Sequence, residues 1–428
     1  MIVPVLNRFL HWAAIGLMSP VLVLMLLSKG VELDMAGIVL AASSAAVVIL
    51  ELPTGILSDL VGRRRVYLLS ILVAMGARLC ILLSRGPAAL GLAFLVFGIS
   101  RALASGSIEA DYIDEFIARR GREKLHSLIS AMGLGETAGL ALGALAGGWI
   151  PVLWARLLPE ANRYDGVIIA QLAVLVALLA LTLCTRAGGA AASGAEGGRE
   201  GGIGVRGYET DRGGRARLGA FLAESRSFLR GDGALPLLLA GAAAWGFSFN
   251  AVEVFWQPRL EALAGGSGDT RLFGLVNGGY FLAAMLGNAL VAALLARRAL
   301  PSLGLAAALR ALVGLAVMGL ALQASVGGFA ACFLGLMCLN GMMGVPESVA
   351  FNSRIPETAR ATFLSLSSLM VQLGGIAGAL AFGLASRFAP IGSLWLGAGA
   401  AFAASALLLV KAGRAAEAMA APARAEGA

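Results

Sequence analysis

The stretch Glu51-Leu-Pro-Thr-Gly-Ile-Leu-Ser-Asp-Leu-Val-Gly-Arg-Arg-Arg65 separates two long apolar runs and decides how the chain is laid out. Its charges, proline and glycines suit the place where one membrane span ends and the next begins. The arginines remain on the cytoplasmic side of a bilayer. Gly55 and Gly62 allow close helix approach and a tight turn. Asp59 is then free to pair with an arginine or with a helix N-terminus.

The composition is that of a chain that lives in a bilayer. Hydrophobic residues make up 59% of the 428 residues and charged residues 14%, and the mean hydropathy is +0.85. The formal net charge is +8. The basic residues are spread over short segments and form no contiguous basic face, so we expect no nucleic-acid partner. The four cysteines have no disulfide or metal-binding spacing, and we expect neither a metal nor a cofactor.

Twelve apolar runs are each long enough to cross the hydrocarbon core, which takes about 20 residues. Their approximate bounds are 9–27, 36–57, 66–83, 88–108, 128–150, 167–183, 234–255, 272–295, 303–324, 328–350, 361–385 and 391–410. The first run lacks a small-residue cleavage site followed by a soluble domain, so we expect it to be a span and not a removable signal peptide. The sequence predicts an all-α integral membrane protein with twelve transmembrane helices.

The Lys and Arg residues predict the orientation of these spans. With the N-terminus inside, the inner side collects 23 of them and the outer side 7. Positive residues are retained on the cytoplasmic side. We therefore expect both termini to be cytoplasmic in the plasma (inner) membrane.

The chain divides into two six-helix halves, residues 1–185 and 232–411. Between them, residues 186–217 are rich in Gly, Ala, Arg and Glu and nearly devoid of large apolar residues, which predicts a flexible cytoplasmic linker. Residues 218–231 place their apolar side chains on one helical face and predict an interfacial amphipathic helix. Residues 412–428 are expected to be a disordered cytoplasmic tail.

The two halves show weak internal similarity. The fourth run ends in Gly106-Ser-Ile-Glu109 and the tenth in Gly344-Val-Pro-Glu347, six spans apart. Arg78 in the third run has a counterpart in Arg310 of the ninth. These pairs predict a parallel pseudo-repeat, with the halves related by an axis along the membrane normal.

The segment Gly55-Ile-Leu-Ser-Asp59-Leu-Val-Gly62-Arg63-Arg64-Arg65 resembles the loop 2–3 signature of the major facilitator superfamily, G-x-L-x-D-x-x-G-R-[KR]-[RK], at every specified position. In that family the motif is a conformational latch between the two halves. The resemblance implies a latch role for Gly55, Asp59, Gly62, Arg63 and Arg64. Asp114 lies at the inner end of the fourth run, within plausible reach of these arginines.

The fifth run carries a second motif. Ser130, Gly139, Gly143-Ala144 and Gly147-Gly148 resemble the antiporter signature G-x8-G-x3-G-P-x2-G-G, which marks exporters in the superfamily, with Ser and Ala in place of its first Gly and its Pro. Ordinary packing of small residues is an equal alternative, since glycines at every fourth position let two helices approach closely. Arg101-Ala-Leu-Ala-Ser-Gly106 partly matches the fourth-span motif of the superfamily, with Gly106 one position later than in that motif. The longer string Ser105-Gly-Ser-Ile-Glu-Ala-Asp-Tyr-Ile-Asp114 resembles a pattern in a bacterial, drug or metabolite efflux-like branch.

Charges inside a bilayer need a partner or a water-lined cavity. Arg101 and Glu136 lie at similar depths on neighbouring runs, which predicts an ion pair. A carboxylate beside an arginine in a low-dielectric site can serve proton coupling, although a permanent structural pair is the alternative. Glu51 is the next candidate for proton coupling.

Other polar residues within or at the ends of spans are candidates for the substrate cavity. Arg78 and Arg310 either bind an anionic substrate or brace carboxylates. Glu253 has a substrate, gating or merely interfacial role. The full set of candidates is Arg78, Glu109, Asn250, Glu253, Arg310 and Glu347.

The sequence therefore predicts a secondary transporter that rocks two halves around a central cavity. Proton-coupled export of a small, partly apolar compound is favoured, with proton-coupled uptake of a metabolite as the alternative within transport. A non-transporting membrane receptor or scaffold would need a soluble output domain, and an enzyme a catalytic constellation; the sequence indicates neither. The expected partners of this monomer are a small-molecule substrate, protons and the lipid bilayer.

Overall fold

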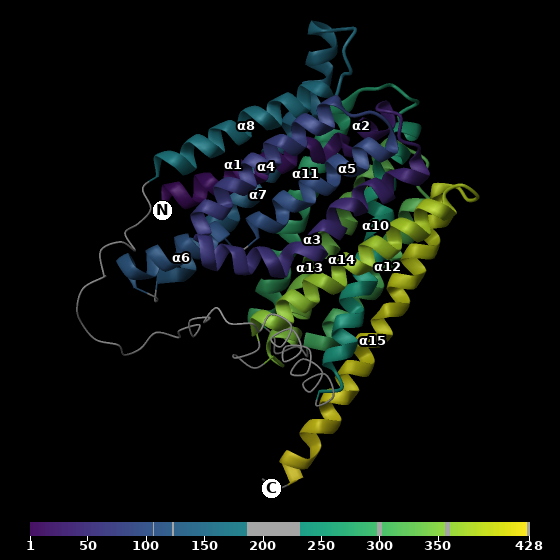
Figure 1. Cartoon of the computed structure of the whole chain (residues 1–428). Coiled ribbons are helices and arrows are strands. Elements are labelled where there is room, and N and C mark those ends of the chain that lie inside the picture. The colour runs from purple at the N-terminus through teal and green to yellow at the C-terminus, as the bar shows by residue number, and fades with distance from the viewer. Residues whose placement is uncertain (106, 122–123, 186–231, 298–301, 356–359, 426–428) are drawn as a thin grey trace, which may run out of the picture.

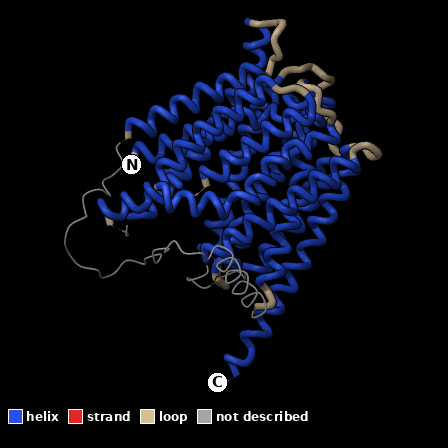
Figure 2. Tube along the Cα trace, in the orientation of Figure 1, coloured by secondary structure: helices blue, strands red, loops and turns tan. Residues whose placement is uncertain are grey.

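The computed structural model describes the chain apart from residues 106, 122–123, 186–231, 298–301, 356–359 and 426–428. Helices make up nearly all of the part described (Figure 2). Within that part, twelve helical segments are long and apolar enough to cross a membrane. The predicted all-α membrane protein with twelve spans is confirmed. The predicted linker and interfacial helix lie outside the described residues.

The described residues of the first half form eight α-helices and one short 3₁₀ turn. They are α1 (Ile2–Met18), η1 (Ser19–Val21), α2 (Leu22–Ser28), α3 (Leu33–Val61), α4 (Arg63–Leu83), α5 (Gly86–Ala104), α6 (Ser107–Arg120), α7 (Leu125–Leu157) and α8 (Asp165–Cys184). We call the end of the bundle where α1 begins the terminal side, and the opposite end, where α2 ends and α3 begins, the distal side.

The described residues of the second half form six helices, each of which crosses the bundle. They are α10 (Leu235–Leu263), α11 (Thr270–Arg297), α12 (Ser302–Ala321), α13 (Val326–Asn352), α14 (Arg360–Ala385) and α15 (Ile391–Ala425). Asp269 precedes α11 and accepts a hydrogen bond from the Arg271 backbone N–H at 3.1 Å, as an N-cap does. Hydrogen bonds from the Arg271 side chain lower the pKa of the Asp269 carboxyl, so the cap is ionised.

The first span is broken, although its sequence is an unbroken apolar run. α1 ends at Met18, and the chain passes through the 3₁₀ turn at Ser19–Val21 before α2 begins. Pro20 lacks a backbone N–H and cannot continue the α-helical ladder. The break leaves backbone groups of this turn available to a neighbouring helix.

Two helix ends differ from the sequence prediction. The fourth run was predicted to continue to Ile108, but α5 ends at Ala104, and the short helix α6 follows. The tail was predicted to be disordered from residue 412, but α15 continues to Ala425. This tail is rich in alanine, the strongest helix former, which favours continuation of the preceding helix.

The two halves pack against each other along two pairs of helices, α3 with α14 and α7 with α11 (Figure 1). The closest contacts lie toward the distal side. Backbone atoms of Ala379 border Gly37, and Asp34 borders Gly383. On α7, Gly148 meets Gly274 at the start of α11. The contact between the halves is thus close at the distal side.

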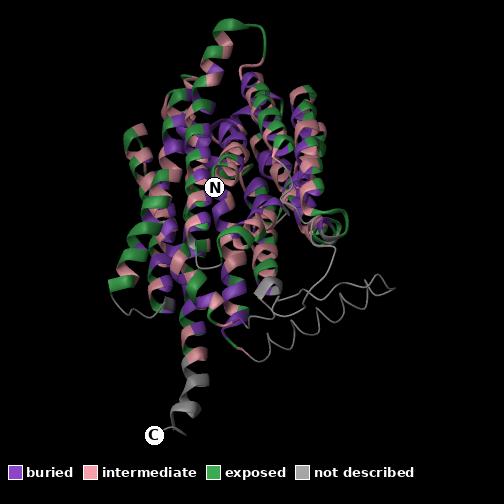
Figure 3. Cartoon of the chain, turned by 90° about the vertical axis from the view of Figure 1, so that its left-hand side faces the viewer, coloured by how far each residue is buried: buried purple, intermediate pink, exposed green. Residues whose placement is uncertain are grey.

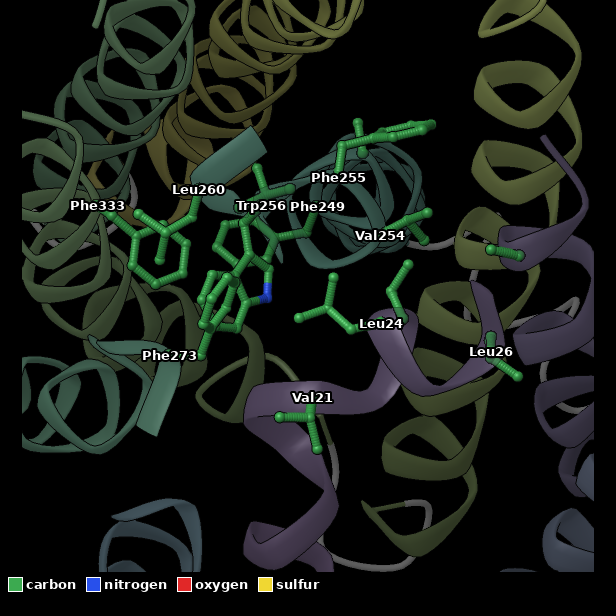
Figure 4. Close-up of a cluster of buried hydrophobic side chains, with 14 of the residues drawn as sticks. Val21, Leu24, Leu26, Phe249, Val254, Phe255, Trp256, Leu260, Phe273 and Phe333 are labelled. Carbon is green, nitrogen blue, oxygen red and sulfur yellow. The ribbon is translucent and has the colours of Figure 1, made fainter. Parts of the chain in front are cut away.

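Buried residues lie between the helices and exposed apolar residues on the outer faces of the bundle, as expected of helices that meet lipid (Figure 3). The main core cluster crosses the boundary between the halves. Figure 4 shows Val21 and Leu24 of the broken first span beside Trp256 of α10, with Phe273 and Phe333 from the second half. This core lies at the distal contact and holds the break in the first span in place.

Candidate functional site

An arginine on the first span joins two carboxylates inside the first half. Arg8 of α1 lies 2.8 Å from the Glu136 carboxylate on α7 and 3.2 Å from the Glu109 carboxylate on α6. Its guanidinium also lies 5.8 Å from the centre of the Trp12 ring. The Arg8 side chain is 22% exposed, so the three charges are partly withdrawn from solvent.

This arrangement corrects the predicted partner of Glu136. The sequence paired Glu136 with Arg101 on the basis of equal depth, but the structure pairs Glu136 with Arg8. Arg101 on α5 interacts electrostatically with Glu51 on α3 instead. The reason is packing: α7 lies against α1, whereas α5 lies against α3 and α4. The first half therefore holds two separate groups of charges.

The glycines of the fifth run determine that α7 lies against α1. A methyl group on Gly139, Gly143 or Gly147 would collide with the backbone of α1. The atoms met are the backbone oxygens of Phe9 for Gly139, Ala13 for Gly143 and Leu17 for Gly147. Gly148 turns to the other side and meets Gly274 of the second half. The small residues thus bring Glu136 within reach of Arg8.

Arg78 of α4 is buried without a carboxylate partner. Its exposed fraction is 5%, and its Nε and Nη1 atoms are buried without a hydrogen-bond acceptor among the described residues. The guanidinium lies over the Phe97 ring of α5, 4.1 Å from the ring centre. Among the described contacts, the Arg78 guanidinium is stabilised by this cation–π interaction, and its charge is otherwise unsatisfied.

Arg310 of α12 is also buried, but its donors are satisfied. It makes a bidentate ion pair with Glu347 of α13, at 2.8 and 2.7 Å, and donates to the Gly241 carbonyl oxygen at 2.9 Å. Its remaining contacts are the Ser405 hydroxyl and the Phe402 ring. The structure thus places Arg310 as a brace among three helices besides its own.

The two arginines are not at matching depths, which corrects their assignment as counterparts. Arg78 lies five residues before the distal end of α4 at Leu83. Arg310 lies eleven residues before the distal end of α12 at Ala321. At about 1.5 Å per residue the offset is roughly 9 Å. The sequence repeat does not extend to these two positions.

Glu253 of α10 is exposed, and the Tyr280 hydroxyl of α11 is its hydrogen-bond partner. One turn before it on α10, the Asn250 amide oxygen is buried without a donor among the described residues. These two sequence candidates therefore lie on one stretch of α10, away from the Arg8 group on α1.

The predicted latch residues form contacts within the first half. Arg63 at the start of α4 makes a 2.7 Å ion pair with Asp114 of α6. Arg64 donates to backbone oxygens at the end of α8, including Thr182 at 2.6 Å. Gly62 has a φ of 102° between α3 and α4, a conformation that favours glycine. The side chain of Asp59 lies outside the described part.

Gly55 differs from its predicted role. It was expected to allow a close helix approach, yet a methyl group added there would meet no described atom within 4 Å. The signature stretch therefore turns the chain at Gly62 and anchors it through Arg63 and Arg64. A link from this stretch to the second half is not among the described contacts.

A cavity of about 420 Å³ lies at the terminal side of the first half, next to these latch residues. It is lined by the start of α1, one face of α6 and the end of α8, and the Tyr112 hydroxyl there is buried without a described partner. Arginines and carboxylates both border it. The described residues hold no group of three metal-binding side chains, here or elsewhere.

The distal side holds the polar contacts between the halves. Gln257 of α10 accepts from the Val23 backbone N–H at 2.8 Å and donates to the Ser19 carbonyl oxygen, also at 2.8 Å. It thereby satisfies the break in the first span. Arg387 after α14 pairs with Asp34 of α3 at 2.5 Å. Sequence reasoning missed Gln257, for which Pro20 in an apolar run was the available signal.

Comparison with known families decides the family of this chain. Residues 5–379 match the model of the Major Facilitator Superfamily. The chain belongs to this superfamily. A search of curated proteins finds no match.

Solved structures agree on the fold. The crystal structure of the nucleoside transporter NupG is similar, with a TM-score of 0.74 and 12% identity over 96% of this chain and 98% of that one. A bacterial homologue of the lysosomal transporter Spinster, in an inward-facing and unoccupied conformation, gives 0.65 and 16% over 97% and 95%. A mutant of the peptide transporter POT gives 0.68 and 15% over 97% and 94%. At these identities, the similarity indicates a shared fold for this member of the superfamily.

Proposed function

We propose that this protein exports a small, partly apolar compound across the plasma (inner) membrane in exchange for protons. Secondary transport follows from its superfamily and fold. The proton coupling rests on one observation above all, the sharing of Arg8 between Glu109 and Glu136 in the first half. The second charge group, Arg101 with Glu51, supports it.

A shared arginine suits proton uptake and release. When Glu136 takes up a proton, Arg8 keeps Glu109 as a partner, so no buried positive charge is left alone. When the halves rock, a change in the distance between α1 and α7 alters the Arg8 contact with Glu136 and with it the cost of the charged carboxylate. Coupling of this kind needs a carboxylate whose contact with the arginine can be made and broken while the arginine keeps another partner.

In this mechanism, the structure corresponds to the inward-facing conformation. The close contacts between halves and the Gln257 bridge lie at the distal side. The ion pairs described at the terminal side each join residues of the same half. With both termini cytoplasmic, as the charge distribution predicts, the terminal side faces the cytoplasm and the closely packed distal side faces outward. The Arg63 and Asp114 pair is then a part of the latch that engages in the outward-facing state.

Proton-coupled uptake of a metabolite is the second candidate. Ala144 stands where the antiporter signature has proline, and α7 continues through this position as a helix. Export, by contrast, is favoured by the resemblance of Gly139, Gly143, Gly147 and Gly148 to the rest of that signature. The packing of α7 against α1 through these glycines is compatible with either direction of transport.

Everted membrane vesicles from cells that express the protein test the proposal. A compound panel is screened for substrate-induced collapse of an imposed proton gradient, acid inside. An exporter accumulates its compound in such vesicles, whereas a proton symporter of the uptake kind expels it. Vesicles without the protein are the background. A protein that moves compounds from the panel with no proton movement would overturn the coupling.

The variant Glu136→Gln then tests the residue. We expect it to abolish proton-driven accumulation and to keep counterflow exchange of substrate, which needs the cavity but no net proton movement. Glu160→Gln, in an exposed distal loop, is the matched control and should behave as wild type. Uphill transport by Glu136→Gln at the wild-type rate would make Glu136 a structural residue and leave Glu51 as the next candidate.

A further inference from the structure

The position of Glu253 distinguishes it from its neighbours on α10. Ala251, Val252 and Val254–Gln257 are buried, and Glu253 alone in this stretch is exposed. α10 packs against α13, α14 and α15 of its own half and against α2 and α3 of the other. A side chain that is exposed on a helix so enclosed faces a space inside the bundle, not lipid.

Glu253 is a carboxylate without a cation. Its hydrogen-bond partner is the Tyr280 hydroxyl, and no Lys or Arg of the described chain forms an ion pair with it. The Tyr280 ring is held by stacking on Phe333 at 6.1 Å, which in turn stacks on Trp256 at 5.2 Å (Figure 4 shows the latter two). A carboxylate at this depth normally has a charge partner, and here the partner is missing.

Two amide oxygens close to Glu253 and Tyr280 along their helices lack a hydrogen-bond donor among the described residues. The Asn250 Oδ1 atom, one helical turn away on α10, is buried without a donor. The Asn277 Oδ1 atom, one turn before Tyr280 on α11, is likewise unpaired, and Asn277 is 4% exposed. Buried oxygens of this kind are hydrogen-bonded in nearly all proteins. Each can take a donor from a ligand.

Aromatic side chains border the same stretch. Trp245, two turns before Glu253, is half-buried and stacks on Phe249 with ring centres 4.9 Å apart. The indole N–H of Trp245 already donates to the Asn340 amide oxygen at 2.9 Å, so what it offers to a ligand is its ring. The site combines a negative charge, acceptor oxygens and aromatic faces, the three features that attract an organic cation.

We propose that Glu253, with Asn250 and Asn277, binds the amine-bearing end of a cationic substrate, an ammonium or guanidinium group on an apolar or aromatic body. The cation supplies the positive charge that Glu253 lacks and the N–H donors that Asn250 and Asn277 lack, and its apolar body lies along Trp245 and Tyr280. This proposal rests on the proposed transport function and specifies its substrate class.

Equilibrium binding to the purified protein in nanodiscs tests the class without requiring transport. The probes are three sets of compounds on phenyl, naphthyl and indolyl bodies. Each set has an arylethylamine, its N-acetyl amide and the arylpropionate, which differ in charge but little in shape. We expect amines to bind, measured by ligand-induced thermal stabilisation and by saturation-transfer NMR, and the amides and acids to bind at least about tenfold more weakly.

Two variants separate the charge from the shape of the site. Glu253→Gln keeps the side-chain volume and should reduce amine binding at least about tenfold. Tyr280→Phe removes the hydroxyl that bonds to the Glu253 carboxylate but keeps the ring, and it should retain amine binding. Glu160→Gln, in an exposed loop, is the control and should bind as wild type.

Three results would overturn the proposal: binding of an acid or amide as tight as its amine, amine binding unchanged in Glu253→Gln, or no binding of any amine. A protein that binds amines in this way but collapses no proton gradient in vesicles would leave the substrate class standing and defeat the coupling.

Discussion

Two buried arginines in the two halves of the molecule have opposite surroundings. Arg310 is 1% exposed and makes a bidentate pair with Glu347, with further acceptors in Gly241 and Ser405. Arg78 is 5% exposed, faces the Phe97 ring, and has two guanidinium nitrogens without an acceptor in the described structure. One charge is satisfied by its own chain and the other is not.

The difference between these surroundings distinguishes a structural role for a buried arginine from a functional one. A buried charge that is fully paired can stay in one arrangement, and its loss leaves the partner charge alone in a low-dielectric site. A buried charge without a partner is costly in a bilayer, and such residues commonly serve transport. We therefore propose that Arg310 belongs to the framework of the second half and that Arg78 takes part in transport.

The largest effect is expected from breaking the Arg310 pair. Glu347→Ala leaves the guanidinium buried and unpaired and should lower the free energy of unfolding by about 3–5 kcal/mol. The measurement is thermal unfolding of the purified protein in one detergent.

Replacing both members at once is the control. Arg310→Met combined with Glu347→Leu removes both charges and keeps the apolar volume, and it should recover most of the lost stability. A single variant that melts within a degree of wild type would show that the pair does not brace the second half.

A much smaller stability effect is expected at Arg78. Arg78→Met gives up the Phe97 contact, worth roughly 1–2 kcal/mol when desolvated, but relieves the burial of an unpaired charge. We expect the free energy of unfolding to change by no more than about 1 kcal/mol, while substrate transport falls. Arg310→Met is the matched comparison and should melt far lower. If both variants melt alike, the contrast between the two arginines is wrong.

The membrane spans were predictable because each is a local property of about 20 consecutive residues. The break at Ser19–Val21 was not, since Pro20 sits in a run that remains apolar on both sides. A hydropathy profile does not detect a local change of backbone conformation. Only the neighbouring side chain of Gln257, which satisfies the freed groups, reveals how the break is stabilised.

The partner of Glu136 could be predicted only in part. Equal depth suggested Arg101, but depth does not determine which helices touch. The sequence did hold a better signal, because Glu136, Gly139, Gly143 and Gly147 follow the three- and four-residue spacing of one helical face. A helix that packs on the glycines must also meet Glu136. The residue spacing does not identify this helix as the first span, because that depends on the tertiary packing of the helices.

The smallest effects are expected from the carboxylates that share Arg8. Glu109→Gln or Glu136→Gln alone should change the free energy of unfolding by less than about 1 kcal/mol, because Arg8 keeps one partner and is itself partly exposed. The double variant leaves Arg8 without a carboxylate and should cost more than the sum of the two single changes.

A double-mutant cycle on thermal unfolding measures this excess, and the Arg310 pair sets its scale. In the second half a single substitution removes the whole interaction, so the loss appears at once. In the first half the redundancy hides the loss until both carboxylates are gone, which is the behaviour required of groups that give up their partner during each transport cycle. Additive effects of Glu109→Gln and Glu136→Gln would mean that Arg8 does not mediate between them, and the proton-coupling role would lose its structural basis.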